Sequence, residues 1–179
     1  MFSTKQKMED GSVRRYIGFV AGPFSNFFKV DFKDPDGEHG EDGEDVVLNC
    51  VEQYFHWKKA VYFGDKETAK LILAEKDPKE QKKLGRAVKN FDPKTWEKIS
   101  KDVMRKGLYA KFSLPGMKEM LLDTDDADIE ECAPYDKFWG TGLSCDEALK
   151  GEKVAEGENN LGKALMETRR KIREEMAVA

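Results

Sequence analysis

Histidine is scarce in this chain, and its scarcity sets several functions aside. The 179 residues include two histidines, His39 and His56, which form neither an HxH nor an HExxH pattern. Zinc sites in proteins are usually built from clustered histidine and cysteine ligands. The three cysteines, Cys50, Cys132 and Cys145, form no CxxC pair. We therefore expect free thiols in a reducing compartment, and chemistry that uses neither a metal ion nor another cofactor.

Long apolar segments and nucleotide-binding fingerprints are also missing. No apolar run approaches the roughly 20 residues of a membrane span, and the first residues lack the apolar segment of a secretory signal. The expected location is cytoplasmic, with a nuclear location as the alternative. The formal charge of -4 argues against a broad basic face for nucleic acid. No P-loop, dinucleotide fingerprint or GxSxG motif is present, but a nucleotide could still bind in a local pocket.

The pattern of apolar residues predicts one mostly helical α+β domain with a few short strands. Strands are expected at 16–20, at 27–32 and in ADIEECA (127–133). Residues 1–14 are expected to be a disordered or frayed lead-in. The acidic, glycine-rich stretch 33–45 has no apolar anchor, so it is expected to be an exposed loop.

Helices account for most of the remaining chain. Aspartate begins three of them as the expected N-cap, at Asp65, Asp77 and Asp92, and in two cases proline follows directly. The expected helices cover about 47–63, 65–75, 77–88, 91–112, 114–124 and 159–176. Most of 134–159 is expected to be loop.

The stretch VEQYFHWKKAVYFG (51–64) combines the apolar residues of a core helix with a carboxylate and an amine. Glu52 and Lys59 are seven residues apart, about two helical turns, so they share a face. One interpretation places both charges at the helix edge, where they reach water while the aromatic residues pack. The other places them in a pocket, where burial raises the pKa of a carboxylate and lowers that of an amine. Such groups suit acid–base and covalent catalysis.

The loop APYDKFWGTG (133–142) is a second candidate region. Asp136 is either an ordinary turn residue or a contact for sugar hydroxyls. Trp139 would then stack on the ligand, and Gly140 would let the backbone approach it closely. The loop alone does not decide between these interpretations.

Two further stretches place polar side chains where a ligand could bind. In GPFSNFF (22–28), Ser25 and Asn26 either cap a turn or donate hydrogen bonds to a ligand from a loop. In ENNLGKALMETRR, Asn159 or Asn160 suits a helix N-cap, and a helix N-terminus can also bind an anion.

The order of these stretches resembles one protein family. FSNFF, VEQYFHWKKA, KKLGR, VMRKGLYAKF, IEECAPYDKFWGTG and NNLGKALMETRR are together similar to the motifs of the NADAR family, named for NAD and ADP-ribose. The resemblance covers about residues 15–175. It implies a single, mostly helical α+β catalytic domain over 15–179 that needs no metal.

The family resemblance also implies an activity, because NADAR proteins are N-glycosidases that act on ribosides. We expect hydrolysis of a base–ribose bond that removes ADP-ribose from guanine, in nucleic acid or in a nucleoside. One alternative substrate is a phosphoribosyl intermediate of riboflavin biosynthesis. A second alternative is a module that binds ADP-ribose without cleaving it, and a third is a helical interaction protein whose aromatic residues only form the core. The expected partner is accordingly an ADP-ribose or phosphoribosyl ligand, or ADP-ribosylated nucleic acid, and no membrane.

Residue by residue, the resemblance implies three catalytic side chains. Glu52, Lys59 and Asp136 match the family's motif positions, with Lys59 as the candidate Schiff-base nucleophile and the two carboxylates as acid–base or charge-stabilising groups. Their division of roles stays open. The implied substrate-binding residues are Ser25, Asn26, Phe27, Glu131, Trp139, Gly140 and Asn160.

Two features depart from the family pattern. Many relatives carry histidine directly after the motif glutamate, where this chain has Gln53, a change expected to alter hydrogen bonding in the pocket. The acidic stretch 33–45 resembles an insertion found in a subgroup, and it could shape the access of a large substrate.

Overall fold

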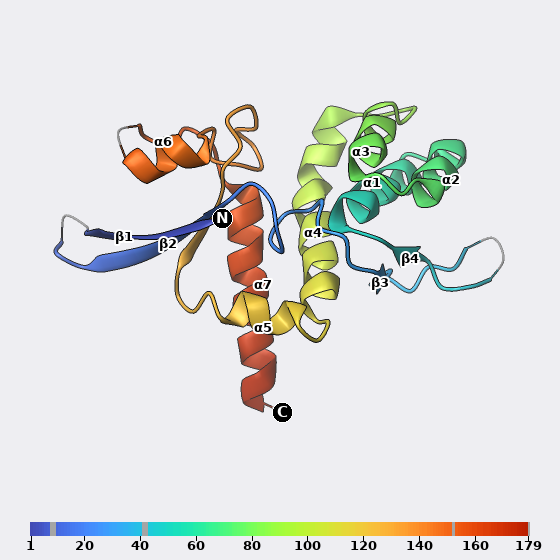
Figure 1. Ribbon diagram of the computed structural model, residues 1–179. Coiled ribbons are helices and arrows are strands. Elements are labelled where there is room, and N and C mark those ends of the chain that lie inside the picture. Colours follow the sequence, from blue (N-terminus) through green and yellow to red (C-terminus); the bar gives the residue numbers. More distant parts are fainter. Residues whose placement is uncertain (8–9, 41–42, 152, 179) are drawn as a thin grey trace. The chain divides into compact units, whose positions relative to one another are not determined.

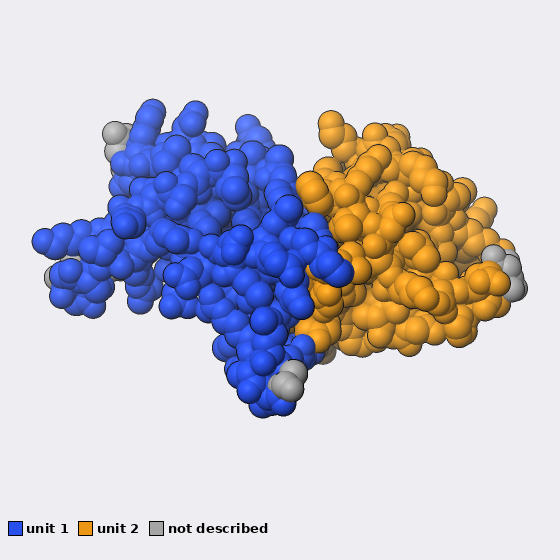
Figure 2. All heavy atoms as spheres, turned by 60° about the horizontal axis from the view of Figure 1, so that its bottom comes forward, with its two compact units in different colours: residues 1–25, 115–179 blue, residues 26–114 orange. Residues whose placement is uncertain are grey.

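The computed structural model describes residues 1–7, 10–40, 43–151 and 153–178. Within these residues the chain forms seven helices and five short strands (Figure 1), which confirms the predicted α+β, mostly helical class. Its internal contacts divide the chain into two compact units (Figure 2). Unit 1 comprises residues 1–25 and 115–179, and unit 2 comprises residues 26–114.

Unit 1 is built on a three-stranded sheet in the order β1-β2-β5. Strand β1 (Phe2–Lys7) pairs antiparallel with β2 (Val13–Phe19), which pairs parallel with β5 (Asp128–Glu131). Helices α5 (Met117–Leu122), α6 (Cys145–Lys150) and α7 (Asn160–Val178) complete the unit. Parallel pairing of β2 with β5 requires a long crossover, which the intervening residues of the chain supply.

Helix α7 packs directly on β5 because its first turn contains a glycine, Gly162. A Cβ at Gly162 would lie 2.0 Å from the carbonyl oxygen of Ile129. Leu161 and Leu165, one turn apart, are fully buried. Further along the helix, the buried guanidinium of Arg169 donates hydrogen bonds to the hydroxyl of Thr124, at 2.7 Å, and to the chain near β5. These contacts hold α7 against β5 and the residues that precede it.

Unit 2 places α1 (Val51–Tyr62) at the centre of a helical cluster. Helices α2 (Lys66–Ala74), α3 (Pro78–Arg86) and α4 (Pro93–Phe112) all pack on it, beside a short hairpin of β3 (Phe32–Lys33) and β4 (Val47–Leu48). Close approach of α4 depends on Gly107, where a Cβ would lie 2.5 Å from the buried ring of Tyr54.

The predicted aspartate caps are confirmed. Asp65, Asp77 and Asp92 each accept a hydrogen bond from a backbone N–H of the first turn of α2, α3 and α4. Pro78 and Pro93 occupy first-turn positions, where no hydrogen-bond donor is missed. Local sequence therefore determines where these three helices begin.

Several predicted boundaries are wrong. Residues 2–7 form β1 instead of a frayed lead-in, because Phe2 packs where Gly18 leaves room: a Cβ at Gly18 would lie 2.3 Å from the Phe2 ring. In the predicted strand 27–32, only Phe32 is in a strand, and Val47–Leu48 is a strand instead of the start of a helix. Helix α6 lies in a stretch predicted as loop. Among the described residues, no helix has the length and apolarity needed to cross a membrane.

Lys111 of α4 is a buried amine in unit 2. Its side chain is fully enclosed, with the ammonium 5.3 Å from the ring centroid of Phe28 and 5.0 Å from that of Phe112. Burial lowers the pKa of Lys111 to about 7. Between pH 7 and the ordinary value of 10.5, the unfolded chain therefore binds a proton that the folded chain does not.

Replacing this lysine should change how stability depends on pH. The free energy of unfolding of the wild type, minus that of Lys111→Met, should rise as pH increases from 7 to 10. Folding removes the proton from Lys111, and removing that proton is less costly at pH 10 than at pH 7. Urea denaturation of both proteins at three pH values measures this difference. Lys98→Met, at an exposed position of α4, is the control and should give a flat difference. A flat difference for Lys111→Met would contradict the prediction.

Candidate functional site

Glu52, His56 and Lys59 lie along one side of α1 and are all buried. The exposed fractions are 5%, 7% and 7%. Glu52 and Lys59 therefore do not reach water from the helix edge, and that interpretation of the motif is wrong. A buried charge needs a partner, so the contacts of each side chain bear on its chemistry.

Glu52 lies in the first turn of α1 among donors and positive charge. Its Oε1 is 3.0 Å from Nε2 of His56 and 3.8 Å from Nζ of Lys82 in α3. Its backbone N–H donates to the carbonyl of Asn26 at 3.0 Å. The N-terminal turn of a helix also favours an anion. The carboxylate of Glu52 is thus surrounded by hydrogen-bond donors and positive charge.

Lys59 lies in surroundings of the opposite kind. Its Nζ donates to the carbonyl of Gly85 at 2.8 Å and lies 3.8 Å from the ring centroid of Phe91. Burial lowers the pKa of Lys59, and the positive charge of Arg86 lowers it further. The structure thus agrees with the direction expected for a pocket lysine, and a lowered pKa increases the share of neutral, nucleophilic amine.

Helix α3 contributes groups that were not predicted as site residues. Lys82 and Arg86 are four residues apart, and Gly85 lies between them on the sequence KKLGR. The ammonium of Lys82 is 5.6 Å from the ring centroid of Phe27. The i, i+4 spacing of the two cations indicates that they share a face of α3. It does not predict that this face contacts α1.

Asn26 and Phe27 begin unit 2, whereas Ser25 ends the first segment of unit 1. Besides binding the backbone of Glu52, Asn26 donates from Nδ2 to the sulfur of Met104 at 3.5 Å. Its buried Oδ1 has no hydrogen-bond partner among the described residues. The backbone N–H of Ser25 donates to the carbonyl of Gly22 at 3.0 Å, so the chain forms a turn here, one of the two roles considered for this stretch.

In unit 1, the loop 133–142 is ordered by its own contacts. Oδ1 of Asp136 accepts hydrogen bonds from the backbone N–H groups of Phe138, at 3.0 Å, and Trp139, at 2.8 Å. This is the turn role considered from the sequence. At Gly140 a Cβ would lie 2.6 Å from Cβ of Ala133, so tight packing of the loop already requires glycine there.

Two asparagines join this loop to neighbouring elements of unit 1. The side chain of Asn159 accepts from the backbone N–H of Glu131, at 3.1 Å, and donates to Ile129 at 2.9 Å. Asn160 donates from Nδ2 to the carbonyl of Phe138 at 2.7 Å. Their side chains therefore bind β5 and the loop, while Asn159 directly precedes α7, at the position expected of the N-cap.

The predicted site residues thus form two groups, each assembled within one unit. Unit 2 holds Asn26, Phe27, Glu52 and Lys59, and unit 1 holds Ser25, Glu131, Asp136, Trp139, Gly140 and Asn160. The group in unit 2 contains the buried carboxylate and amine, and the group in unit 1 is mainly a backbone-ordered loop.

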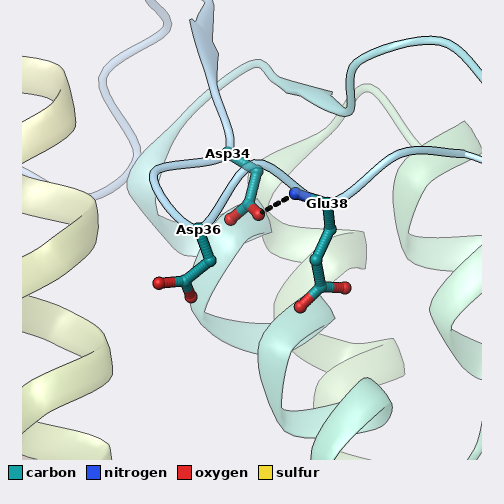
Figure 3. A group of neighbouring side chains, drawn as sticks. All are labelled: Asp34, Asp36 and Glu38. Atoms are coloured by element: carbon teal, nitrogen blue, oxygen red, sulfur yellow. Dashed lines mark hydrogen bonds between the residues drawn. The ribbon is translucent and has the colours of Figure 1, made fainter.

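The acidic stretch 33–45 is anchored to α1 by charge. Nζ of the buried Lys58 lies 3.1 Å from Asp34, 3.0 Å from Asp36 and 2.7 Å from Glu38. Figure 3 shows these three carboxylates on one turn of chain, where the backbone N–H of Glu38 donates to the side-chain oxygen Oδ2 of Asp34. The expectation of an unanchored exposed loop is therefore wrong for this part of it, because an ion pair replaces the missing apolar anchor.

The three carboxylates could geometrically hold a cation, since one oxygen of each lies within 4.8 Å of the others. Lys58 already supplies positive charge there. Burial alone would lower the pKa of Lys58, but its hydrogen bonds to Glu38, Asp36 and Asp34 raise it overall, so the ammonium form is favoured. The expected independence from metal stays a prediction.

Gln53 does not contact the carboxylate of Glu52. Its Oε1 accepts from the backbone N–H of Asn49 at 2.7 Å, and its Nε2 donates to Ile72 at 2.9 Å and to two further carbonyls at the end of α2. The position next to the motif glutamate therefore serves the packing of α2 in this chain.

Sequence comparison agrees with this arrangement. The NADAR domain matches residues 18–173, which include both groups of site residues. The chain belongs to the NADAR domain family. N-glycosidase R617 of Acanthamoeba polyphaga mimivirus is 40% identical over 154 residues, which is 85% of this chain and 86% of the relative. N-glycosidase YbiA of Escherichia coli strain K12 is 32% identical over 163 residues, which is 88% and 82% of the two chains.

A solved structure supports the fold of this NADAR protein. The NMR structure of E. coli YbiA matches with a TM-score of 0.70 at 28% identity, covering 90% of this chain and 87% of that one. The likeness therefore extends over both units of the chain, and the family includes proteins named N-glycosidases.

Removing the ammonium of Lys58 should expose the carboxylate cluster to cations. Lys58→Met should lower the free energy of unfolding by about 3 kcal/mol, because it removes the ammonium paired with the buried carboxylate of Asp34. Millimolar Ca²⁺ should restore part of that loss in the variant, since clustered carboxylates bind hard cations, and should leave the wild-type melting temperature unchanged. Lys66→Met, at an exposed position of α2, is the control. A Ca²⁺-dependent rise in the wild-type melting temperature would contradict the prediction.

Proposed function

We propose that this NADAR protein is an N-glycosidase that hydrolyses a base–ribose bond and removes ADP-ribose from ADP-ribosylated guanine. The observation that carries the proposal is the buried pair on α1, in which Glu52 lies among donors and Lys59 has a lowered pKa. The names of the relatives R617 and YbiA support the reaction class.

The proposed reaction begins with rupture of the bond between C1′ and the base nitrogen. Positive charge develops on the ribose as the base leaves and takes up a proton, and the carboxylate of Glu52 stabilises that charge. The neutral amine of Lys59 forms a bond to C1′ and loses a proton, which balances the proton taken up by the departing base. Ring opening converts this adduct to a Schiff base, and water hydrolyses it to the sugar aldehyde and free Lys59.

Charge on α3 supports a phosphorylated ligand. Lys82 lies beside Glu52 and Phe27, and Arg86 is near enough to lower the pKa of Lys59. Two cations suit the diphosphate of ADP-ribose, and one would suffice for the single phosphate of the alternative, a phosphoribosyl riboflavin intermediate. We therefore favour ADP-ribose as the released group.

The remaining residues enter the proposal through the family resemblance. Asp136 is proposed as a second charge-stabilising carboxylate, and Trp139 as a stacking surface for the base or ribose. The proposed ligand contacts also include Ser25, Asn26, Phe27, Glu131, Gly140 and Asn160. With a net charge of -4, polymeric nucleic acid would be bound locally and with strong salt dependence.

Turnover of two substrates tests the proposal. The protein should release ADP-ribose from ADP-ribosylated guanosine faster than it cleaves a phosphoribosyl riboflavin intermediate, as measured by chromatography of the products. Lys59→Ala should lose about a thousandfold in kcat, as expected when a nucleophile is removed. Lys89→Ala, an exposed lysine outside the site, should keep wild-type activity. Binding of ADP-ribose without release from either substrate would support a non-catalytic module instead.

Borohydride trapping tests the covalent step directly. Reduction during turnover should leave a sugar adduct on Lys59 that mass spectrometry can locate, because borohydride reduces a Schiff base to a stable amine. The Lys59→Arg variant keeps a positive charge without a comparable nucleophile and should give no adduct. Rapid turnover without any adduct would exclude the Schiff-base route.

The pH dependence should report the amine of Lys59. The kcat of the enzyme should rise with pH and level off below 10.5, the ordinary pKa of lysine. The reason is that the neutral amine reacts and the pKa of Lys59 is lowered. Arg86→Gln removes one cause of that lowering, so its pH profile should move to higher pH. If the pH profile of Arg86→Gln matched that of the wild type, the rise of kcat with pH would belong to a group other than Lys59.

A further inference from the structure

His56 is a buried ionisable residue to which neither the family motif nor the proposed reaction assigns a role. It lies one turn after Glu52 on α1, with Nε2 at 3.0 Å from the carboxylate oxygen Oε1. The side chains are 9% and 7% exposed, so the contact is shielded from water. A hydrogen bond in such surroundings orients both partners strongly.

The other ring nitrogen of His56 determines which partner donates. Nδ1 is buried and has no hydrogen-bond partner among the described residues. It faces the backbone of Gly85, where a Cβ would lie 2.0 Å from it. A proton on Nδ1 would be a buried donor without an acceptor, which is unfavourable. The neutral ring is therefore expected to carry its proton on Nε2 and donate it to Glu52.

The charge around Glu52 favours the same assignment. If Glu52 were protonated and donated to Nε2, the proton of a neutral ring would be on the unpartnered Nδ1. The ammonium of Lys82, 3.8 Å from the same Oε1, would also lose its attraction to a negative charge. Both observations favour a carboxylate that accepts from the ring.

We propose that His56 is a positioning residue that donates from Nε2 to Glu52 and fixes it as the charge-stabilising carboxylate. The inference rests on the proposed N-glycosidase function, and it divides the roles within the site. Glu52 stabilises positive charge on the ribose and does not supply the proton that the departing base takes up. Lys59 provides the nucleophile.

Gly85 couples the two functional side chains of α1. Its carbonyl accepts the hydrogen bond from Lys59 at 2.8 Å, and its missing side chain leaves room for the ring of His56. The ring is further held by an edge-to-face contact with Phe55, at 5.4 Å between centroids. One residue of α3 therefore supports both the carboxylate and the amine.

Nitrogen NMR of the imidazole tests the assignment without any substrate. The chain has two histidines, so a His39→Asn variant leaves the signals of His56 alone. His39 is exposed and pairs with Asp45, outside the proposed site. At a pH where the ring is neutral, the spectrum should show the proton on Nε2. A proton on Nδ1 would overturn the proposal.

Kinetics of two matched variants test the positioning role. His56→Gln can still donate an N–H to Glu52 and should keep kcat within about threefold, whereas His56→Leu cannot and should lose about 10- to 100-fold in kcat with little change in KM. Circular dichroism checks that each variant is folded. If His56→Leu does not fold, the kcat of His56→Gln and the ring nitrogen that carries the proton in the NMR spectrum test the proposal instead. Equal losses in both variants, or none in either, would overturn the role.

The two proposals fail in different ways. A proton on Nε2 combined with no turnover of any riboside would overturn the N-glycosidase function, and with it the role of His56 in the reaction. Turnover combined with a proton on Nδ1 would overturn the positioning role and leave the function standing. Gly85→Ala should disturb both contacts, and it is expected to lower kcat more than His56→Gln does.

Discussion

Four acidic or basic side chains, those of Glu52, His56, Lys58 and Lys59, are buried along α1, and the packing of unit 2 depends on how each of them is paired. An isolated buried charge is strongly unfavourable, whereas a paired and hydrogen-bonded one is tolerated. Lys58 binds three carboxylates of the loop after β3, Glu52 has His56 and Lys82, and Lys59 has the carbonyl of Gly85. These pairings connect α1 to the acidic loop on one side and to α3 on the other.

The same pairings set the chemical character of the side chains. The surroundings of Glu52 contain a ring nitrogen of His56, a nearby ammonium and the N-terminal turn of a helix. Those of Lys59 contain a carbonyl, an aromatic ring and a like charge, and they lower its pKa. Separate environments for an acid and an amine on one helix are the usual means of giving them different roles.

Local patterns allowed much of this fold to be predicted from the sequence. The caps at Asp65 and Asp92 and the co-facial placement of Glu52 and Lys59 depend only on residues a few positions apart. The anchoring of the acidic loop by Lys58 could not be predicted, because its partners are 20 or more residues away and a periodic pattern does not say which distant group a charge will meet. The pairing of β1 escaped prediction for the same reason, since it depends on Phe2 and the space at Gly18.

The position of histidine illustrates what a motif leaves undetermined. Directly after the motif glutamate this chain has Gln53, whose amide donates hydrogen bonds to carbonyls at the end of α2. The imidazole occurs three residues later, at His56, and there it meets the motif glutamate directly. A single turn of helix thus separates a residue that serves packing from one that contacts the carboxylate. Because that contact needs an empty Cβ position at Gly85 on another helix, the role of His56 follows from the fold and not from its place in the motif.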